Sequence, residues 1–139
     1  MKVLKFGGTS VKNSENITKT IAIIKENLAQ EKLVVVVSAL GGITNKLIEA
    51  SVKASTGDDS YKQIFNEISE AHFKTIEGLV SGNLKLECEE YVLSLLTSFK
   101  DILHGLTLIR ELSPRSLDLV SSFGERLSAY IISKALVQN

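Results

Sequence analysis

The chain has 139 residues, which is about the size of one domain with a hydrophobic core of its own. Its formal net charge is zero and it shows no basic stripe, so the charge pattern gives a nucleic-acid partner no support. The single cysteine, Cys88, cannot form an intramolecular disulfide, and no apolar run reaches the roughly 18 residues of a membrane helix. We therefore expect a cytoplasmic protein without a nucleic-acid or membrane partner.

The first part of the chain predicts a β-α-β unit. Residues 2–6 read as a buried strand, and Asn13 or Ser14 can cap the helix that follows. Apolar side chains then recur at the spacing of one helix face, at Ile17, Ile21, Ile24 and Leu28. Residues 33–37 are one leucine and four valines without polar alternation, which predicts a strand covered on both faces in a parallel sheet.

A glycine-rich turn follows the first predicted strand. Gly7 and Gly8 lack a Cβ, so the backbone there can approach a phosphate closely, and Thr9 and Ser10 lead into the helix. Lys5, just before the glycines, can add an ammonium for a phosphate oxygen. The lysine precedes the glycines, so the pattern differs from a P-loop, in which the lysine follows them.

A second glycine-rich turn, residues 38–45, links the next strand to a helix predicted over 44–56. In open α/β sheets, ligands bind at the carboxyl ends of the strands, and both glycine turns lie at such ends. We therefore expect one ligand site at this edge of the sheet. Its polar side chains would come from both turns, namely Lys5, Thr9, Ser10, Ser38 and Thr44.

Strand signals stop in the middle of the chain, where residues 58–110 predict a helical insert. Two apolar faces at helical spacing indicate a hairpin of helices packed on the α/β core. Ser113 and Pro114 then read as an N-cap and a first helical residue. A last helical face continues to the end of the chain, with Gly124 as a possible break.

Few other residues attract a functional interpretation. His72 and His104 have no partners at metal-ligand spacing, and Cys88 lies on an apolar helix face, so we expect no metal site. Glu125 differs, because a carboxylate in an apolar helical stretch needs a cationic or hydrogen-bonding partner. It is either functional or a structural neighbour of Arg126.

Three motifs together carry a resemblance to a known family. The run from Lys5 to Val11 (KFGGTSV) resembles the signature of aspartokinases, in the amino-acid kinase family. Residues 36–45 resemble the second loop of that family, and residues 122–128 (SFGERLS) resemble its third block. The stretch 103–108 is similar to the helical insert of the type fused to homoserine dehydrogenase. The fold implied is α/β: an amino-acid-kinase-like three-layer fold with parallel strands and a helical insert.

The resemblance implies an aspartate kinase, which moves the γ-phosphoryl group of ATP, with Mg²⁺, onto the side-chain carboxylate of L-aspartate. This step opens the route to lysine, threonine, methionine and isoleucine. By family likeness, Lys5 neutralises phosphate charge during transfer, and the Gly7 and Gly8 amides hold the phosphate. Thr44 and Ser38 contact the aspartate, and Glu125 pairs with its ammonium. The acceptor is already a carboxylate, so no general base is required.

The family's kinase domain is about twice this length. Residues 1–139 are therefore expected to be only its N-terminal, substrate-side lobe, from a full-length protein that forms a homo-oligomer. Two alternatives stay open. One is a related kinase that acts on glutamate, acetylglutamate, uridylate or carbamate. The other is a module that binds a small molecule without catalysis.

Overall fold

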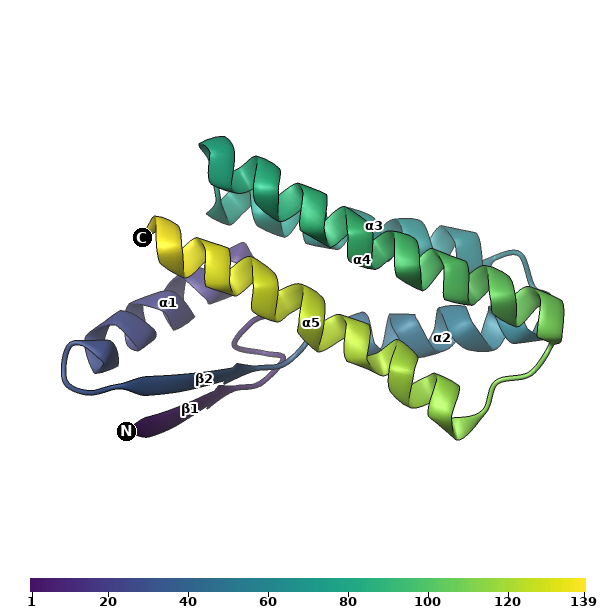
Figure 1. The fold of residues 1–139 in the computed structure, drawn as a ribbon, viewed down its shortest axis with the longest axis horizontal. Helices are drawn as coiled ribbons and strands as arrows, with labels where there is room; N and C mark the ends of the chain where they lie inside the picture. The colour runs from purple at the N-terminus through teal and green to yellow at the C-terminus, as the bar shows by residue number, and fades with distance from the viewer.

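The computed structural model describes all residues from Met1 to Asn139. Two strands and five helices follow one another in the chain (Figure 1). Their order is β1 (Lys2–Phe6), α1 (Ser14–Leu28), β2 (Leu33–Val37), α2 (Ile43–Thr56), α3 (Tyr61–Leu79), α4 (Gly82–Ile109) and α5 (Pro114–Gln138). The small sheet lies at one end of the molecule, and the helices form its bulk (Figure 1).

The predicted β-α-β unit is confirmed. Strands β1 and β2 pair in parallel, from Lys2 opposite Leu33 to Phe6 opposite Val37. Helix α1 connects them, and the Asn13 side chain caps it by accepting a hydrogen bond from the Asn16 amide at 3.0 Å. Parallel pairing brings the carboxyl ends of both strands to the same edge of the sheet.

The prediction that residues 33–37 are covered on both faces is wrong for these 139 residues. Helices α1 and α5 contact β2, but alternate strand residues stay open to solvent. Val3 is 61% exposed, and Val34 and Val36 are each 43% exposed. These three side chains and Lys5 belong to one face of the sheet, because the strands pair in register and side chains alternate. We call them the open sheet face.

The helical insert forms the predicted hairpin. Helices α3 and α4 run side by side, and α2 lies along them (Figure 1). Gly57 ends α2 in the left-handed conformation at φ +77°, and the Ser113 hydroxyl caps α5 by accepting from the Ser116 amide. One continuous core of 27 buried apolar residues joins the β-α-β unit, the hairpin and α5. The sheet, the hairpin and α5 therefore share a single packing unit.

Helix α4 is long and apolar enough, by composition, to cross a membrane. It contains no unbroken apolar run of that length, because polar and charged residues recur along it. A packed core helix meets the same criteria, and α4 carries a buried stripe toward the other helices. The stripe consists of Cys88, Val92, Leu95, Leu96, Phe99, Leu103 and Leu106.

His72 and Cys88 are both buried in the core. The Nδ1 atom of His72 lies 2.6 Å from the Ile68 carbonyl oxygen, and burial lowers the pKa of the imidazole. Burial raises the pKa of the Cys88 thiol to about 11, so the sulfur is a poor nucleophile. Cys88 thus behaves as a core residue, as the apolar helix face around it predicted.

Candidate anion site at the two glycine turns

The two glycine-rich turns lie against each other at the carboxyl edge of the sheet. The Ser38 amide donates a hydrogen bond of 3.0 Å to the Phe6 carbonyl oxygen, so the turns begin at the same level. A Cβ built on Gly8 would lie 3.8 Å from the carbonyl oxygen of Ala39. The expected meeting of the two turns is therefore present.

Both turns line one open hollow of about 610 Å³, which we call the glycine-turn hollow. Its lining residues are Gly8, Thr9, Lys12, Gly41 and Gly42. Gly42 has φ +78° and leads directly into α2, a conformation that favours glycine. The volume suits a small molecule or one end of a larger one.

Unused backbone donors surround this hollow. The amides of Gly8, Thr9, Gly41 and Gly42 donate to no oxygen of the protein. Helix α2 starts here without a side-chain cap, so its positive end is also uncompensated. Lys12 is the only charged residue of the lining. Amide donors, a helix N-terminus and a lysine together favour a bound anion such as a phosphate.

Helix α5 brings the third motif to the same place. A Cβ on Gly124 would lie 2.7 Å from the Cβ of Ala39 and 3.8 Å from Cγ2 of Ile43, so α5 touches the second glycine turn there. One turn further, the Ser128 hydroxyl donates a 2.6 Å hydrogen bond to the Ser38 carbonyl oxygen. The sequence allowed a helix break at Gly124, but α5 continues through this residue. Gly124 lets the helix approach the loop closely.

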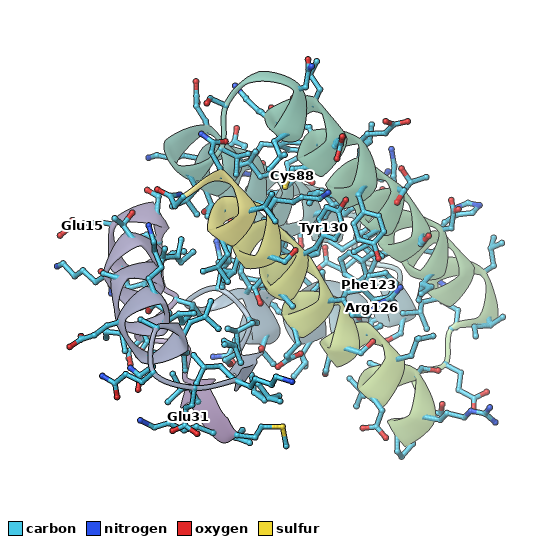
Figure 2. All side chains as sticks on the ribbon, turned by 60° about the vertical axis from the view of Figure 1, so that its left-hand side comes forward. Glu15, Glu31, Cys88, Phe123, Arg126 and Tyr130 are labelled. Carbon is cyan, nitrogen blue, oxygen red and sulfur yellow. The ribbon has the colours of Figure 1, made fainter.

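Glu125 follows Gly124 and is exposed to solvent. The expectation that its carboxylate needs a partner within the protein is therefore wrong. Glu125 forms no ion pair. Arg126 does not pair with it either, and instead lies over the Phe123 ring with its guanidinium carbon 5.0 Å from the centroid. Figure 2 shows Phe123 and Arg126 beside each other on α5. The Glu125 carboxylate is therefore free for a ligand.

Of the predicted site residues, only Gly8 and Thr9 line the hollow, and the others lie outside its lining. Lys5 is exposed on the open sheet face and is not part of the hollow lining. Ser10 faces α1, where its carbonyl oxygen accepts from the Thr20 hydroxyl at 2.9 Å. Thr44 and Ser38 are partly buried, and their hydroxyls form no hydrogen bond within the protein. Gly7 is exposed, and its carbonyl oxygen accepts a 3.0 Å hydrogen bond from the Ser10 amide, which closes the turn.

Two residues of the site were not identified from the sequence. Lys12 lines the hollow because its side chain lies over Gly41, a contact that no local pattern reveals. Ser128 belongs to the third motif, but its role in tying α5 to Ser38 depends on the packing of distant segments. The only sequence signal for this role of Ser128 was its position as a polar residue on an apolar helix face, one turn after Gly124.

A nearby ion pair fixes the start of α2. Lys46 donates a 2.8 Å hydrogen bond to Glu67 of α3. This contact, together with a hydrogen bond from Gln63, lowers the pKa of the Glu67 carboxyl. Lys46 is thus engaged away from the hollow and does not add to its positive charge.

Gly124→Ala tests the close approach of α5 to the loop. The new methyl group would meet the Ala39 Cβ, which cannot rotate away, at a cost of about 1–3 kcal/mol. Gly105→Ala is the matched control, since nothing lies within 4 Å of its Cβ position in α4. There, the higher helix propensity of alanine alone should raise the free energy of unfolding by about 1 kcal/mol. We expect a lower melting temperature for Gly124→Ala than for Gly105→Ala. Equal melting temperatures would contradict the packing described here.

Comparison with known proteins supplies a family for this arrangement. The amino acid kinase family matches residues 1–139, the whole chain. Aspartokinase 2, chloroplastic, of Arabidopsis thaliana is 33% identical over 137 residues, which are 96% of this chain and 24% of that protein. The aspartokinase of Candida albicans is 33% identical over 138 residues, covering 94% of this chain and 25% of that protein. The chain thus spans about a quarter of the length of these curated relatives.

Two further similarities extend the comparison. The bifunctional aspartokinase/homoserine dehydrogenase of Buchnera aphidicola is 30% identical over 146 residues, covering 98% of this chain and 17% of that protein. The crystal structure of E. coli aspartokinase III in complex with aspartate and ADP superimposes with a TM-score of 0.83 at 26% identity. That match covers 99% of this chain and 29% of the crystallised chain. The expected fold is therefore confirmed.

Proposed function

The chain belongs to the amino acid kinase family, and on that premise we propose that it forms the substrate-side part of an aspartate kinase. The observation that carries the proposal is the contact of all three motifs at one edge of the sheet. There, amide donors of two glycine turns meet the helix that presents a free carboxylate at Glu125. The aspartokinases among the relatives support aspartate as the acceptor.

The proposed reaction transfers the γ-phosphoryl group of ATP to the side-chain carboxylate of L-aspartate and yields 4-phospho-L-aspartate and ADP. The attacking oxygen already carries negative charge, so the protein needs to position the reactants and stabilise charge rather than remove a proton. The free amides of Gly8, Gly41 and Gly42 suit the negative phosphoryl oxygens. Lys5, at the end of β1, would stabilise the charge that develops during transfer.

The two ends of the aspartate would bind on different sides of this edge. A substrate ammonium is disfavoured in the glycine-turn hollow, where the only charged side chain is a lysine. The exposed carboxylate of Glu125 on the neighbouring helix suits that ammonium. The hydroxyls of Thr44 and Ser38, unused within the protein, suit the substrate carboxylates. In this arrangement the side-chain carboxylate of aspartate points toward the phosphate donor.

Mg²⁺ would arrive with the nucleotide. These residues contain no group of three or more histidine, cysteine or acidic side chains that could hold a metal ion. The ion would therefore take its ligands mainly from phosphate oxygens, as Mg²⁺ often does in phosphoryl transfer. Its chemistry would be to neutralise charge on the transferred group. The product would then serve the synthesis of lysine, threonine, methionine and isoleucine.

A panel of acceptors tests this function on the complete gene product. ADP release would be measured with ATP, Mg²⁺ and, in turn, aspartate, glutamate, acetylglutamate, uridylate and carbamate. We expect release with aspartate alone. Release with another acceptor would identify the related kinase instead, and binding of aspartate without any ADP release would identify a non-catalytic module.

Glu125→Gln tests the substrate ammonium contact. Losing one charge-assisted hydrogen bond should weaken aspartate use by about 1.5–3 kcal/mol, seen mainly as a higher KM for aspartate. Asp118→Asn is the matched control, because Asp118 is also exposed and unpaired on α5, two turns earlier. We expect its aspartate KM to remain that of the unaltered protein. Unchanged aspartate kinetics in Glu125→Gln would remove this residue from the substrate site.

A further inference from the structure

Lys12 lies outside the residues that the sequence motifs assign to the site, yet it borders the glycine-turn hollow. Its side chain lies across Gly41 of the other turn. A Cβ on Gly41 would fall 2.7 Å from Cγ and 3.2 Å from Cβ of Lys12, so only a glycine leaves room for this course of the lysine. The two residues therefore form one feature that spans both turns.

The Lys12 ammonium is not engaged within the protein. It forms no salt bridge and no hydrogen bond, although acidic residues occur close by in the sequence. The nearest of them, Glu15, is held by Lys19 at 3.0 Å. No carboxylate lines the hollow. The positive charge of Lys12 is thus not neutralised by the protein.

Lys12 also borders a second, smaller hollow of about 200 Å³ between the start of α1 and α3. That hollow already contains the cation of Lys74 in its lining. Repulsion between like charges makes it the less favourable place for a second ammonium. The glycine-turn hollow instead offers only uncharged partners and four unused amides, so an anion there gains from Lys12 directly.

We propose that Lys12 is a phosphate-binding residue of this site, positioned by Gly41. The proposal rests on the proposed kinase function and adds to it a second cation, besides Lys5, for the phosphates of the nucleotide. Lys12 reaches the hollow from the loop that precedes α1, whereas Lys5 belongs to the open sheet face. The two lysines would therefore contact the polyphosphate from different directions.

The test uses the complete gene product and inorganic tripolyphosphate as the probe, with binding measured by calorimetry. Lys12→Met should weaken tripolyphosphate binding by about tenfold or more and raise the KM for ATP, because one charge-assisted contact is lost. Lys12→Arg should restore most of the affinity. Gly41→Ala should weaken binding as Lys12→Met does, since the methyl group displaces the lysine stem. Lys62→Met, an exposed lysine of α3, is the control and should leave binding unchanged.

Equal tripolyphosphate affinity in Lys12→Met and the unaltered protein would overturn the proposal, and so would an absence of tripolyphosphate binding in the unaltered protein. These outcomes are separate from a failure of the proposed function. A protein that binds tripolyphosphate through Lys12 but releases no ADP with aspartate would retain the phosphate contact and lose the kinase assignment. A protein that phosphorylates aspartate equally well with and without Lys12, at equal ATP KM, would lose only the Lys12 contact.

Discussion

Lys5→Ala in the complete gene product is expected to lower kcat for aspartate phosphorylation by about 10²–10³-fold, with little change in aspartate KM. Removing one preorganised charge-stabilising group commonly costs this much, because its interaction is strongest in the transition state. Lys5 is the penultimate residue of β1, close to the glycine turn, and no carboxylate of the protein neutralises it. The measurement is steady-state ADP release at varied aspartate and saturating ATP.

Lys2→Ala is the matched control for this variant. Lys2 is an exposed lysine on the same strand, and its ammonium bonds Asn27 rather than the glycine turns. The control should keep kcat within a factor of about two, since surface contacts of this kind contribute little. Near-normal turnover in Lys5→Ala, at an unchanged melting temperature, would exclude Lys5 from catalysis.

A polypeptide limited to residues 1–139 is expected to release no measurable ADP with aspartate and to bind ATP weakly at best. It holds two paired strands and about a quarter of the length of its relatives. The glycine turns and α5 supply places for phosphate and aspartate, whereas the adjoining hollow with apolar lining measures only about 200 Å³ and contains the cation of Lys74. Steady ADP release that depends on both ATP and aspartate would contradict this expectation.

The same polypeptide should also self-associate. Val3, Val34 and Val36 are the exposed apolar side chains of the open sheet face, and each strand of the pair leaves one edge without a partner. Exposed apolar strands of this kind invite pairing with another chain. Val34→Lys should reduce association, because a charge on the face opposes stacking. Sedimentation of both polypeptides at equal concentration measures this, and a monomeric unaltered polypeptide would show that the face does not drive association.

Periodicity predicted the elements of this fold well, and it did so for a physical reason. Of the predicted helix face, Ile17, Ile21 and Ile24 are buried as their spacing required, because a helix with one apolar face has only one favourable way to pack. Leu28, in the last turn of α1, is the exception and is 58% exposed. The pairing of the two strands and the meeting of their glycine turns also followed, since a parallel crossover brings both carboxyl ends to one edge.

The errors concern what a sequence pattern cannot report. The apolar residues at 33–37 indicate a strand that is buried on both faces. They do not indicate which segment covers the second face, which is open to solvent in these residues. The apolar residues around Glu125 did not reveal that its own side chain turns to solvent. A glycine in the sequence is compatible both with a helix break and with the close approach of another segment. At Gly124, only the contact with Ala39 shows that the second role applies. Lys12 was missed because its partner, Gly41, lies on another loop.

Identification of the reaction product is the most direct test of aspartate phosphorylation by this protein. The complete gene product would be incubated with ATP, Mg²⁺, L-aspartate and hydroxylamine, which converts an acyl phosphate into a hydroxamate. We expect aspartyl hydroxamate in amounts equal to the ADP released, and none when aspartate is omitted. ADP release without hydroxamate, or hydroxamate formed from another acceptor in preference to aspartate, would contradict it.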